Sequence, residues 1–339
     1  MLKSEMIGIA VLGAGRAGMV HARNFAEHVP EARLVGVYDA DRERVDAVVS
    51  ELGTKGYYDI EDLLRDASID AVVIAAPTFA HKDLVVAAAA AQKAILCEKP
   101  LALTPDEAEA MQEAVVAAGV PFVMGFMRRY DENFRRAREI IARGDIGRPL
   151  IIKSTGKGPG LPSRWAWDVK KSNGILGEVN SHDFDSVHWL MEAEYAWVFA
   201  RGKNFRSEEL RKEFPDFYDN ALVMFEMTNG CLGTIDGSCP SEYGYDARIE
   251  IQGTEGLLFI GDIARHGLTV CTRSKGVAKN VVDSWRSLFR DAYLREDRHL
   301  VECLVKGVQP QTTLLDGKRA LNVVRAANQS IITGKVVSL

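Results

Sequence analysis

The sequence lacks the features that mark membrane, secreted and nucleic-acid-binding proteins. Its longest uninterrupted apolar run, residues 84–91, is far shorter than the roughly 20 residues that a transmembrane helix needs. Residues 1–6 carry no apolar signal-peptide segment, because the apolar run that follows leads straight into glycines. The formal net charge of −5 provides no excess of basic side chains for nucleic acid. We therefore expect a cytoplasmic protein that binds neither a membrane nor nucleic acid.

The chain also lacks paired cysteines. Its five cysteines are scattered, and no Cys-x-x-Cys motif occurs. An odd, dispersed set indicates reduced cytosolic thiols rather than disulfides or a zinc site. The five are Cys97, Cys231, Cys239, Cys271 and Cys303.

What is present is an ordinary globular composition on a long chain. Hydrophobic residues make up 47% of the sequence and charged residues 26%, which is typical of folded proteins. A chain of 339 residues without repeats or a low-complexity linker is too long for one small domain and fits two.

A glycine motif near the start is the first sign of function. An apolar run, residues 6–12, precedes the motif, and a helical pattern follows it. Strand, G-x-G-x-x-G and helix, in that order, are the context that a dinucleotide-binding fingerprint requires. Its glycines allow a tight turn, a close approach of the backbone to a pyrophosphate, and close packing of helix on strand, while the helix start offers free N–H groups. The candidate cofactor-binding residues of the motif are Gly13, Gly15, Arg16, Ala17 and Gly18.

Asp39 predicts which dinucleotide is bound. The second predicted strand, residues 34–38, ends at this aspartate, about 20 residues after the glycines, where an acid binds the ribose 2′-hydroxyl. A carboxylate there repels a 2′-phosphate, so NAD is favoured over NADP. Arg42 is close enough in sequence to reduce that preference.

The third and fourth predicted strands also end in candidate residues. A Pro-Thr turn closes the strand at 71–75, and we expect it beside the cofactor; for His81, at the start of the next helix, a structural role is favoured. The strand at 94–97 runs into Glu98, Lys99 and a proline. Ligands of open parallel sheets lie beyond the carboxyl ends of the strands. The further cofactor candidates are therefore Ala76, Pro77, Thr78, His81, Glu98 and Lys99.

The overall pattern predicts two different domains. Alternating strands and helices up to about residue 126 predict a doubly wound parallel sheet, that is, an α/β domain. After Pro149 strands dominate, and Asn229-Gly230 between two of them is a hairpin signal. We expect a dinucleotide-binding domain at 1–124, a substrate-binding and oligomerisation domain at 125–314, and a last helix at about 315–334 that packs on the first. The second domain should be α+β, with a large, open, mostly antiparallel sheet.

The open sheet leads us to expect an oligomer. An open sheet of this size needs a cover on its second face, and a partner subunit is a natural cover. A homodimer or homotetramer built through this sheet is the predicted assembly.

A second chemical cluster surrounds His182. The apolar spacing of the segment predicts a helix, which places Glu178 and His182 four residues apart on one face. A carboxylate near an imidazole can fix its tautomer and orientation. The same pair resembles half a metal site, but no third ligand has fitting spacing, so we expect no metal.

Taken together, these motifs resemble the Gfo/Idh/MocA family of sugar and polyol dehydrogenases over nearly the whole chain. The resemblance implies a Rossmann first domain, a cis bond before Pro100, and Lys99 and His182 as the catalytic pair. Residues 125–131 and 243–246 look closest to the myo-inositol 2-dehydrogenase branch. Those enzymes usually carry aspartate four residues before the histidine, where this chain has Glu178, which affects the expected substrate more than the reaction.

The resemblance implies an NAD-dependent enzyme that oxidises a secondary hydroxyl of a cyclic polyol or sugar to the ketone. His182 would be the general base, Lys99 would relay the proton or hold the oxygen, and Glu178 would orient one of them or bind a neighbouring hydroxyl. Two alternatives remain: a sugar or glycoside enzyme of the same family, including one that oxidises its substrate only transiently, and a non-catalytic NAD-binding sensor. Further candidates for substrate contacts are Arg129, Arg164, Asp185 and Tyr243.

Overall fold

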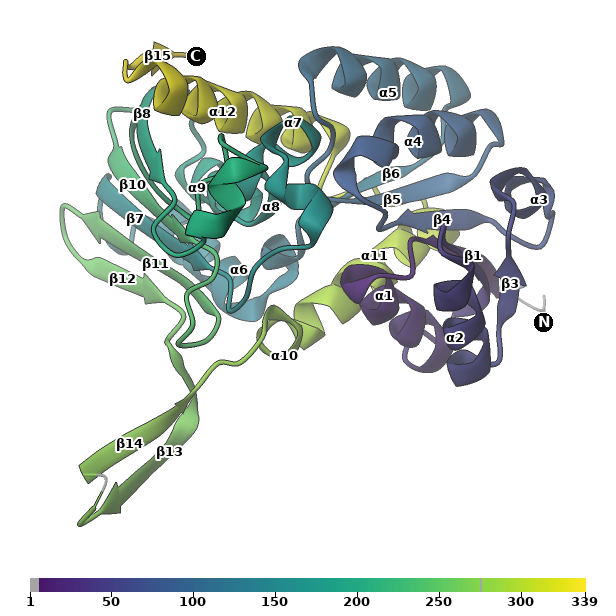
Figure 1. The fold of residues 1–339 in the computed structure, drawn as a ribbon, viewed down its shortest axis with the longest axis horizontal. Helices are drawn as coiled ribbons and strands as arrows, with labels where there is room; N and C mark the ends of the chain where they lie inside the picture. Colours follow the sequence, from purple (N-terminus) through teal and green to yellow (C-terminus); the bar gives the residue numbers. More distant parts are fainter. Residues whose placement is uncertain (1–5, 275) are drawn as a thin grey trace. The chain divides into compact units, whose positions relative to one another are not determined.

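The structure is a computed structural model that describes residues 6–274 and 276–339, without the side chains of 266–268 and 276 (Figure 1). The chain divides into two compact units. The first comprises residues 1–130 and 291–318, and the second comprises 131–290 and 319–339. This division differs from the expected one, because residues 291–318 return to the first unit and most of the last helix belongs to the second.

The first unit contains a parallel six-stranded sheet, as predicted. Every neighbouring pair of its strands runs in parallel, and the order places β1 beside both β2 and β4. The strands, in spatial order, are β3 (Lys55–Tyr57), β2 (Ala32–Tyr38), β1 (Ile7–Leu12), β4 (Ala71–Ile74), β5 (Ala94–Glu98) and β6 (Phe122–Gly125).

Helices cover both faces of this sheet (Figure 1). α4 and α5 pack together on one face, and α1, α2 and α11 contribute to the hydrophobic core on the other. Local signals set several helix ends: α2 ends at Gly53 in the left-handed conformation, and Thr104 and Glu107 form a capping box at the start of α5. The helical segments are α1 (Arg16–Glu27), α2 (Arg42–Leu52), α3 (Ile60–Arg65), η1 (Thr78–Ala80), α4 (His81–Ala90), α5 (Pro105–Ala118), η2 (Met127–Tyr130) and α11 (Arg290–Lys306).

α11 explains the return of the chain to the first unit. Its residues Leu300, Val301 and Cys303 are buried in the same core cluster as Phe25 and Val73. The charged run at 295–298 obscures the apolar positions of this helix, so no helix is predicted over residues 294–306.

The second unit contains a seven-stranded sheet that is antiparallel except where β10 pairs with β7. The predicted Asn229-Gly230 hairpin joins β9 to β10 and is confirmed. The mostly antiparallel α+β domain is confirmed as well. In spatial order the strands are β12 (Leu257–Ile260), β11 (Asp246–Gly253), β7 (Pro149–Lys157), β10 (Leu232–Ser238), β9 (Asn220–Met227), β8 (Tyr195–Lys203) and β15 (Val337–Ser338).

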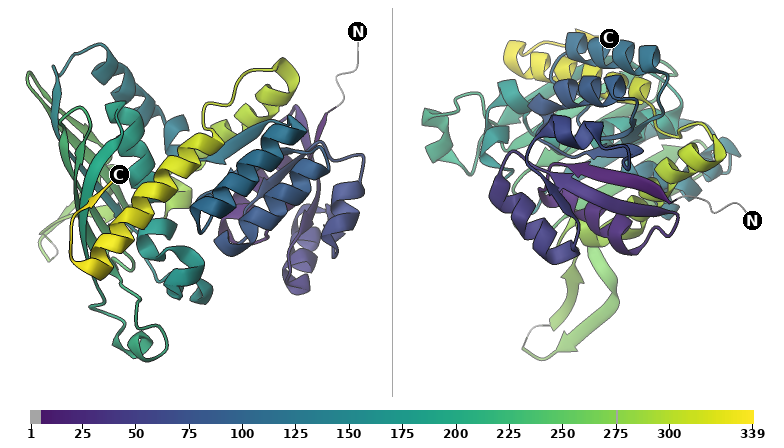
Figure 2. Two further views of the ribbon diagram at one scale, coloured as in Figure 1. Left: turned by 90° about the horizontal axis from the view of Figure 1, so that it is seen from above. Right: turned by 90° about the vertical axis from the view of Figure 1, so that its right-hand side faces the viewer.

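The helices of this unit that the structure describes lie on one face of the sheet, as the left panel of Figure 2 shows. A separate two-stranded hairpin, β13 (Ala264–Thr272) and β14 (Gly276–Val281), extends beyond the sheet. In the described ranges no helix combines the length and the apolar character needed to cross a bilayer. The remaining helical segments are α6 (Glu132–Ala142), η3 (Arg164–Trp167), α7 (Val169–Ser172), α8 (Gly174–Glu178), α9 (Ser181–Met191), η4 (Glu208–Lys212), α10 (Trp285–Leu288) and α12 (Leu314–Thr333), the last of which begins in the first unit.

Candidate functional site

The glycine motif forms the turn between β1 and α1. Gly13 has φ +103°, and a Cβ on it would lie 2.6 Å from the backbone nitrogen of Ala76. A Cβ on Gly18 would lie 1.8 Å from the carbonyl oxygen of Gly13, so helix and turn touch there. A Cβ on Gly15 would meet no atom within 4 Å. Gly15 therefore borders open space, as a backbone that receives a phosphate should.

The start of α1 suits an anion. Gly15 is its N-cap and provides no side-chain hydrogen bond, and the first turn contains no acidic residue. The first N–H groups of a helix lack partners within the helix, and its dipole favours negative charge. Arg16 is exposed and Ala17 is partly exposed, so both border the same turn.

Asp39 lies beside this turn, immediately after β2. Its Oδ2 accepts a hydrogen bond from the backbone N–H of Ala14 at 2.7 Å, and its Oδ1 accepts one from Asp41 at 2.9 Å. The carboxylate is thereby held against the glycine motif. Each oxygen keeps acceptor capacity, which a ribose hydroxyl could use.

Arg44, which is not among the predicted site residues, lies beside Asp39. A guanidinium nitrogen of Arg44 lies 4.0 Å from the Asp39 carboxylate. Arg42 instead places its guanidinium 5.0 Å from the centre of the Tyr58 ring. Arg42 and Arg44 are two residues apart on α2, so their side chains point in different directions, and only the structure shows that Arg44 faces Asp39.

His81 connects two strand ends. Its Nδ1 lies 2.8 Å from the carbonyl oxygen of Pro100, and its Nε2 lies 2.8 Å from that of Ala76. Burial lowers the pKa of His81, although the two carbonyls oppose that effect. The ring therefore braces the turn at Ala76 against Pro100. Thr78, three residues before His81, is also buried. The structural role that we favoured for His81 matches these contacts.

Glu98 and Lys99 lie at the carboxyl end of β5. Glu98 is buried, and its Oε2 accepts the backbone N–H of Lys99 at 3.1 Å. The Lys99–Pro100 bond is cis, as the resemblance implies. Lys99 is partly exposed. The strand end is thus held in place by Glu98, while Lys99 keeps access to solvent.

A buried polar cluster behind Glu98 is absent from the sequence predictions. His21, on α1, places Nε2 3.2 Å from Oε1 of Glu98 and Nδ1 2.6 Å from Oδ1 of Asp297. Asn24 donates to the other oxygen of Asp297 at 2.7 Å. Burial acts to lower the pKa of His21, but Asp297 and Glu98 raise it well above its ordinary value. The only sequence signal was a histidine three residues after the glycine motif.

In the second unit a polar brace positions the start of α9. Asp183 is fully buried and accepts hydrogen bonds from Ser154 at 2.7 Å and from Asn180 at 2.9 Å. Asn180 also donates to the carbonyl of Gly156 at 3.1 Å. A Cβ on Gly156 would lie 2.0 Å from Asp183, so this glycine is required for the approach of α9 to β7.

The predicted helix through Glu178 and His182 is not continuous. α8 ends at Glu178, and α9 begins at Ser181, with Asn180 as its N-cap. The prediction that Glu178 and His182 share one face of a single helix is therefore wrong. Two N–H groups, of Val179 and Asn180, both point to the carbonyl of Ile175, which widens the turn and ends α8. His182 is buried and Glu178 is partly buried.

Two of the four suggested substrate contacts are arginines that form ion pairs. Arg129 is buried and forms an ion pair with Asp316 at 3.0 Å. Arg164 is exposed, pairs with Glu213, and lies 5.6 Å from the centre of the Trp167 ring. Arg129 therefore stabilises the first unit.

The other two differ in exposure. Asp185 is buried on α9, one helical turn from His182. Tyr243 is 44% exposed, and its hydroxyl donates to Asp246 at 2.6 Å. Burial, followed by the hydrogen bond to Asp246, raises the pKa of Tyr243, so the hydroxyl stays protonated at neutral pH.

The residues of the first unit fit a dinucleotide. Open space at Gly15, an uncapped helix start, and the adjacent carboxylate of Asp39 are the donor and acceptor set that a pyrophosphate and a ribose require.

Comparison with protein-family models supports the same conclusion. Residues 7–126 match the Gfo/Idh/MocA model described as an oxidoreductase family with an NAD-binding Rossmann fold. Residues 134–259 match the Gfo/Idh/MocA C-terminal domain.

Several relatives extend over the whole chain. The scyllo-inositol 2-dehydrogenase (NAD(+)) of Bacillus subtilis is 36% identical, covering 99% of this chain and 97% of the relative. The myo-inositol 2-dehydrogenase of Thermotoga maritima is 34% identical, with 98% of each covered. The crystal structure of scyllo-inositol dehydrogenase from Lactobacillus casei, with bound NAD(H) and scyllo-inositol, superposes with a TM-score of 0.90 at 25% identity, covering 98% of this chain and 99% of the other. This chain therefore belongs to the Gfo/Idh/MocA family of oxidoreductases, and its first unit is the NAD-binding Rossmann domain of that family.

Proposed function

We propose that this enzyme oxidises a secondary hydroxyl of an inositol, or of a closely related cyclic polyol, to the ketone with NAD. The observation that carries the proposal is a lysine, Lys99, held at the carboxyl end of β5 in a chain that matches inositol 2-dehydrogenases along its whole length. Lysine at a strand end of a dinucleotide-binding sheet is where a substrate oxygen would need a cation or a proton relay.

The first unit supplies the cofactor contacts in this proposal. The turn at Gly13 and Gly15 and the start of α1 bind the pyrophosphate, and Asp39 accepts the ribose hydroxyl. When bound, NAD accepts the hydride at its nicotinamide, and the protein provides orientation and proton transfer. The brace from His81 to Pro100 keeps the Pro77-Thr78 turn and the Lys99 strand end in fixed relation.

Lys99 and His182 provide the proton chemistry. His182 takes the proton of the substrate hydroxyl, because an imidazole has an ordinary pKa near neutral pH. Lys99 stabilises the developing oxyanion or passes its proton on. Glu178 orients one of the two or binds a neighbouring hydroxyl, and Asp185 and Tyr243 are the remaining candidates for hydroxyl contacts. Arg129 leaves this set because Asp316 already holds its guanidinium.

The test is NADH formation, followed by absorbance, with scyllo-inositol, myo-inositol, glucose and simple glycosides. We expect a rate with at least one inositol that falls in Lys99→Ala and persists in Lys82→Ala, a partly exposed lysine on α4. No rate with any inositol, despite NAD binding measured by calorimetry, would overturn the inositol assignment. Product formed without net NADH would instead support transient oxidation.

We also propose that two copies of the chain pack through the second sheet. The helix-free face of that sheet exposes apolar side chains on neighbouring strands, and their register places them on one side. Such a patch is unusual on a monomer and typical of an interface. A second copy is the expected cover because the charged pair of Lys153 and Glu250 lies on the same face, between the apolar side chains of β12 and β10, and provides both signs. The patch consists of Ile151, Leu222, Met224, Leu232, Leu257 and Phe259.

The cysteines support a reducing location. All five are free thiols in the structure, and only Cys271 is exposed. Because thiols persist in the cytosol, we place the enzyme there, and cell fractionation tests this assignment.

A further inference from the structure

We propose that the buried cluster of His21, Glu98 and Glu296 binds a divalent metal ion of the Zn²⁺ type. One nitrogen or oxygen of each residue lies within 4.8 Å of those of the other two, and all three residues are buried. This differs from the sequence analysis, which predicts no metal.

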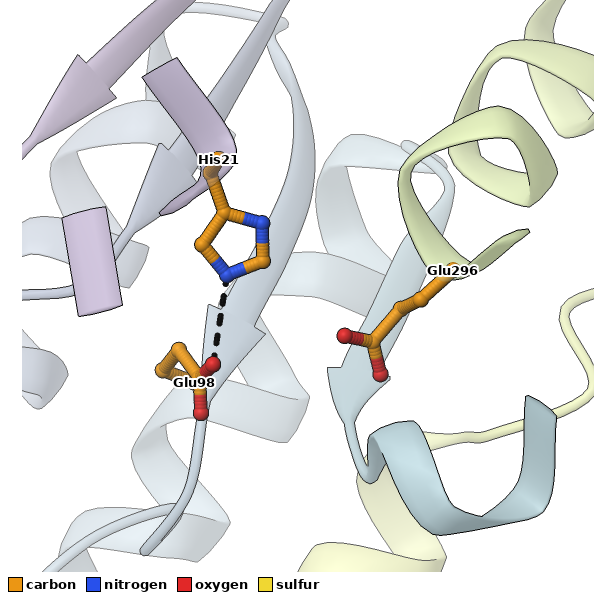
Figure 3. A group of neighbouring side chains, drawn as sticks. All are labelled: His21, Glu98 and Glu296. Atoms are coloured by element: carbon orange, nitrogen blue, oxygen red, sulfur yellow. Dashed lines mark hydrogen bonds and ion pairs between the residues drawn. The ribbon is translucent and has the colours of Figure 1, made fainter. Parts of the chain in front are cut away.

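Glu296 provides the first argument. Its side chain is fully buried, and in the part of the chain that the structure describes neither carboxylate oxygen has a hydrogen-bond partner. A buried carboxylate without partners is strongly destabilising, so native proteins rarely leave one unpaired. Figure 3 shows this carboxylate pointing toward the pair formed by His21 and Glu98. A cation between the three residues would satisfy it.

His21 provides the second argument. Its Nδ1 lies 2.6 Å from the carboxylate of Asp297, while its Nε2 faces Glu98 and Glu296. Histidines that bind metals usually donate the other ring N–H to a carboxylate, which fixes the tautomer and the ring plane. Asn24 in turn holds the second oxygen of Asp297 at 2.7 Å. The support that a metal-binding histidine needs is therefore already in place.

The distances are compatible with this ion. Zinc bonds of about 2.0–2.2 Å in a tetrahedron separate neighbouring ligand atoms by roughly 3.3–3.5 Å. His21 Nε2 and Glu98 Oε1 lie 3.2 Å apart in a hydrogen bond, which is close to this length, so an ion that replaces the shared proton needs little movement at this edge. Glu296 would move toward them by rotation of its side chain. An imidazole ligand favours zinc or a similar transition metal over Mg²⁺ or Ca²⁺, which prefer oxygen.

The ion would have a structural role. The three ligands come from α1, β5 and α11, which are distant in sequence. A metal bond would fix α1, which begins at the glycine turn, to the strand end that carries Lys99. Because Nε2 must lose its proton before it binds, metal affinity should increase with pH.

The experiment uses the purified full chain, stripped with a chelator and then loaded with Zn²⁺ or Co²⁺. We expect about one tightly bound ion per chain by mass spectrometry after gel filtration, with solvent as the fourth ligand beside the three side chains. We also expect a higher Tm with Zn²⁺ than with Mg²⁺, and the intense visible bands of tetrahedral Co²⁺. X-ray absorption of the zinc-loaded wild type should report nitrogen and oxygen neighbours that include an imidazole.

Variants locate the site. Glu296→Gln should lose the bound ion, and Asp297→Asn should weaken binding by roughly 10–100-fold, the usual effect of removing a carboxylate behind a histidine ligand. Glu302→Gln, an exposed carboxylate on the same helix, should bind as the wild type does. A wild type that retains no ion, or a Glu296→Gln chain that binds as tightly as the wild type, would overturn the proposal. If Glu296→Gln does not fold, the stoichiometry and the X-ray absorption of the wild type decide the question alone.

Discussion

At the scale of single residues, Asp39 is the side chain that should decide between the two nicotinamide dinucleotides. Asp39→Asn removes the charge but keeps an oxygen that can accept the Ala14 N–H. We expect the preference for NAD over NADP, measured as the ratio of kcat/KM, to fall by roughly tenfold or more, because repulsion of the 2′-phosphate is lost. Asp41→Asn, which keeps a good N-cap for α2, is the matched control and should leave the ratio unchanged. An equal ratio in wild type and Asp39→Asn would mean that Asp39 does not face the ribose.

His182 should be the general base. His182→Ala should lower kcat by roughly 10²–10⁴-fold, the usual effect of a lost acid–base group, while NAD binding measured by calorimetry stays normal. His188→Ala, on the same helix and next to Glu194, is the control and should retain most activity. A kcat close to wild type in His182→Ala would remove this residue from the mechanism.

Asp316 should contribute stability that depends on pH. Burial acts to raise the pKa of Asp316, but the charge of Arg129 and hydrogen bonds from Thr313 hold it below its usual value. A carboxyl with a lowered pKa in the folded state stabilises the fold above its unfolded pKa of about 3.9, and this contribution is lost as the pH falls through the folded value. Asp316→Asn should therefore cost about 3 kcal/mol of unfolding free energy at pH 7, since it breaks a buried ion pair with Arg129 by removing one charge.

Denaturant titrations across a pH series measure this difference. The gap between wild type and Asp316→Asn should be largest at neutral pH and should narrow in acid. A gap that stays constant down to the acid limit would show that the contribution is packing and not charge.

At the scale of elements, two glycines of the β1–α1 turn should have different roles, Gly18 in stability and Gly15 in cofactor binding. A Cβ on Gly18 would overlap the Gly13 carbonyl, whereas a Cβ on Gly15 meets nothing. Gly18→Ala should therefore lower Tm clearly, and Gly15→Ala should leave Tm nearly unchanged while raising the KM for NAD. Thermal unfolding and steady-state kinetics on the two variants test the pair. A Gly15→Ala enzyme with a wild-type KM would argue that the pyrophosphate does not approach this glycine.

At the scale of the whole molecule, we expect the exposed face of the seven-stranded sheet to pack against a second copy of the chain. Met224 is 49% exposed on β9 within the apolar patch, and Met224→Lys would place a charge there. We expect light scattering after size exclusion to show a dimer or tetramer for the wild type and a smaller species for Met224→Lys. Val116→Lys, at a site 72% exposed on α5, is the control and should keep the assembly. A monomeric wild type would remove the proposed interface.

The sequence by itself determined the parts of this protein that depend on neighbouring residues. The parallel sheet, the glycine turn, the Asn229-Gly230 hairpin and the alternating strands of the second unit are all present as predicted. They were predictable because hydrophobic periodicity and turn chemistry act over a few residues.

Only the tertiary structure decided how distant segments pair. His21 and Asp297 are 276 positions apart, and Arg129 and Asp316 are 187 apart. Their contacts depend on the path of the whole chain and on packing against the sheet, so no local pattern marks them. The break at Asn180 is similar, because the hydrogen bonds that anchor this residue and Asp183 to β7 compete with helical propensity and prevail. The local sequence thus determined the helices, strands and turns. Burial in the folded chain determined which distant polar side chains form hydrogen bonds and ion pairs.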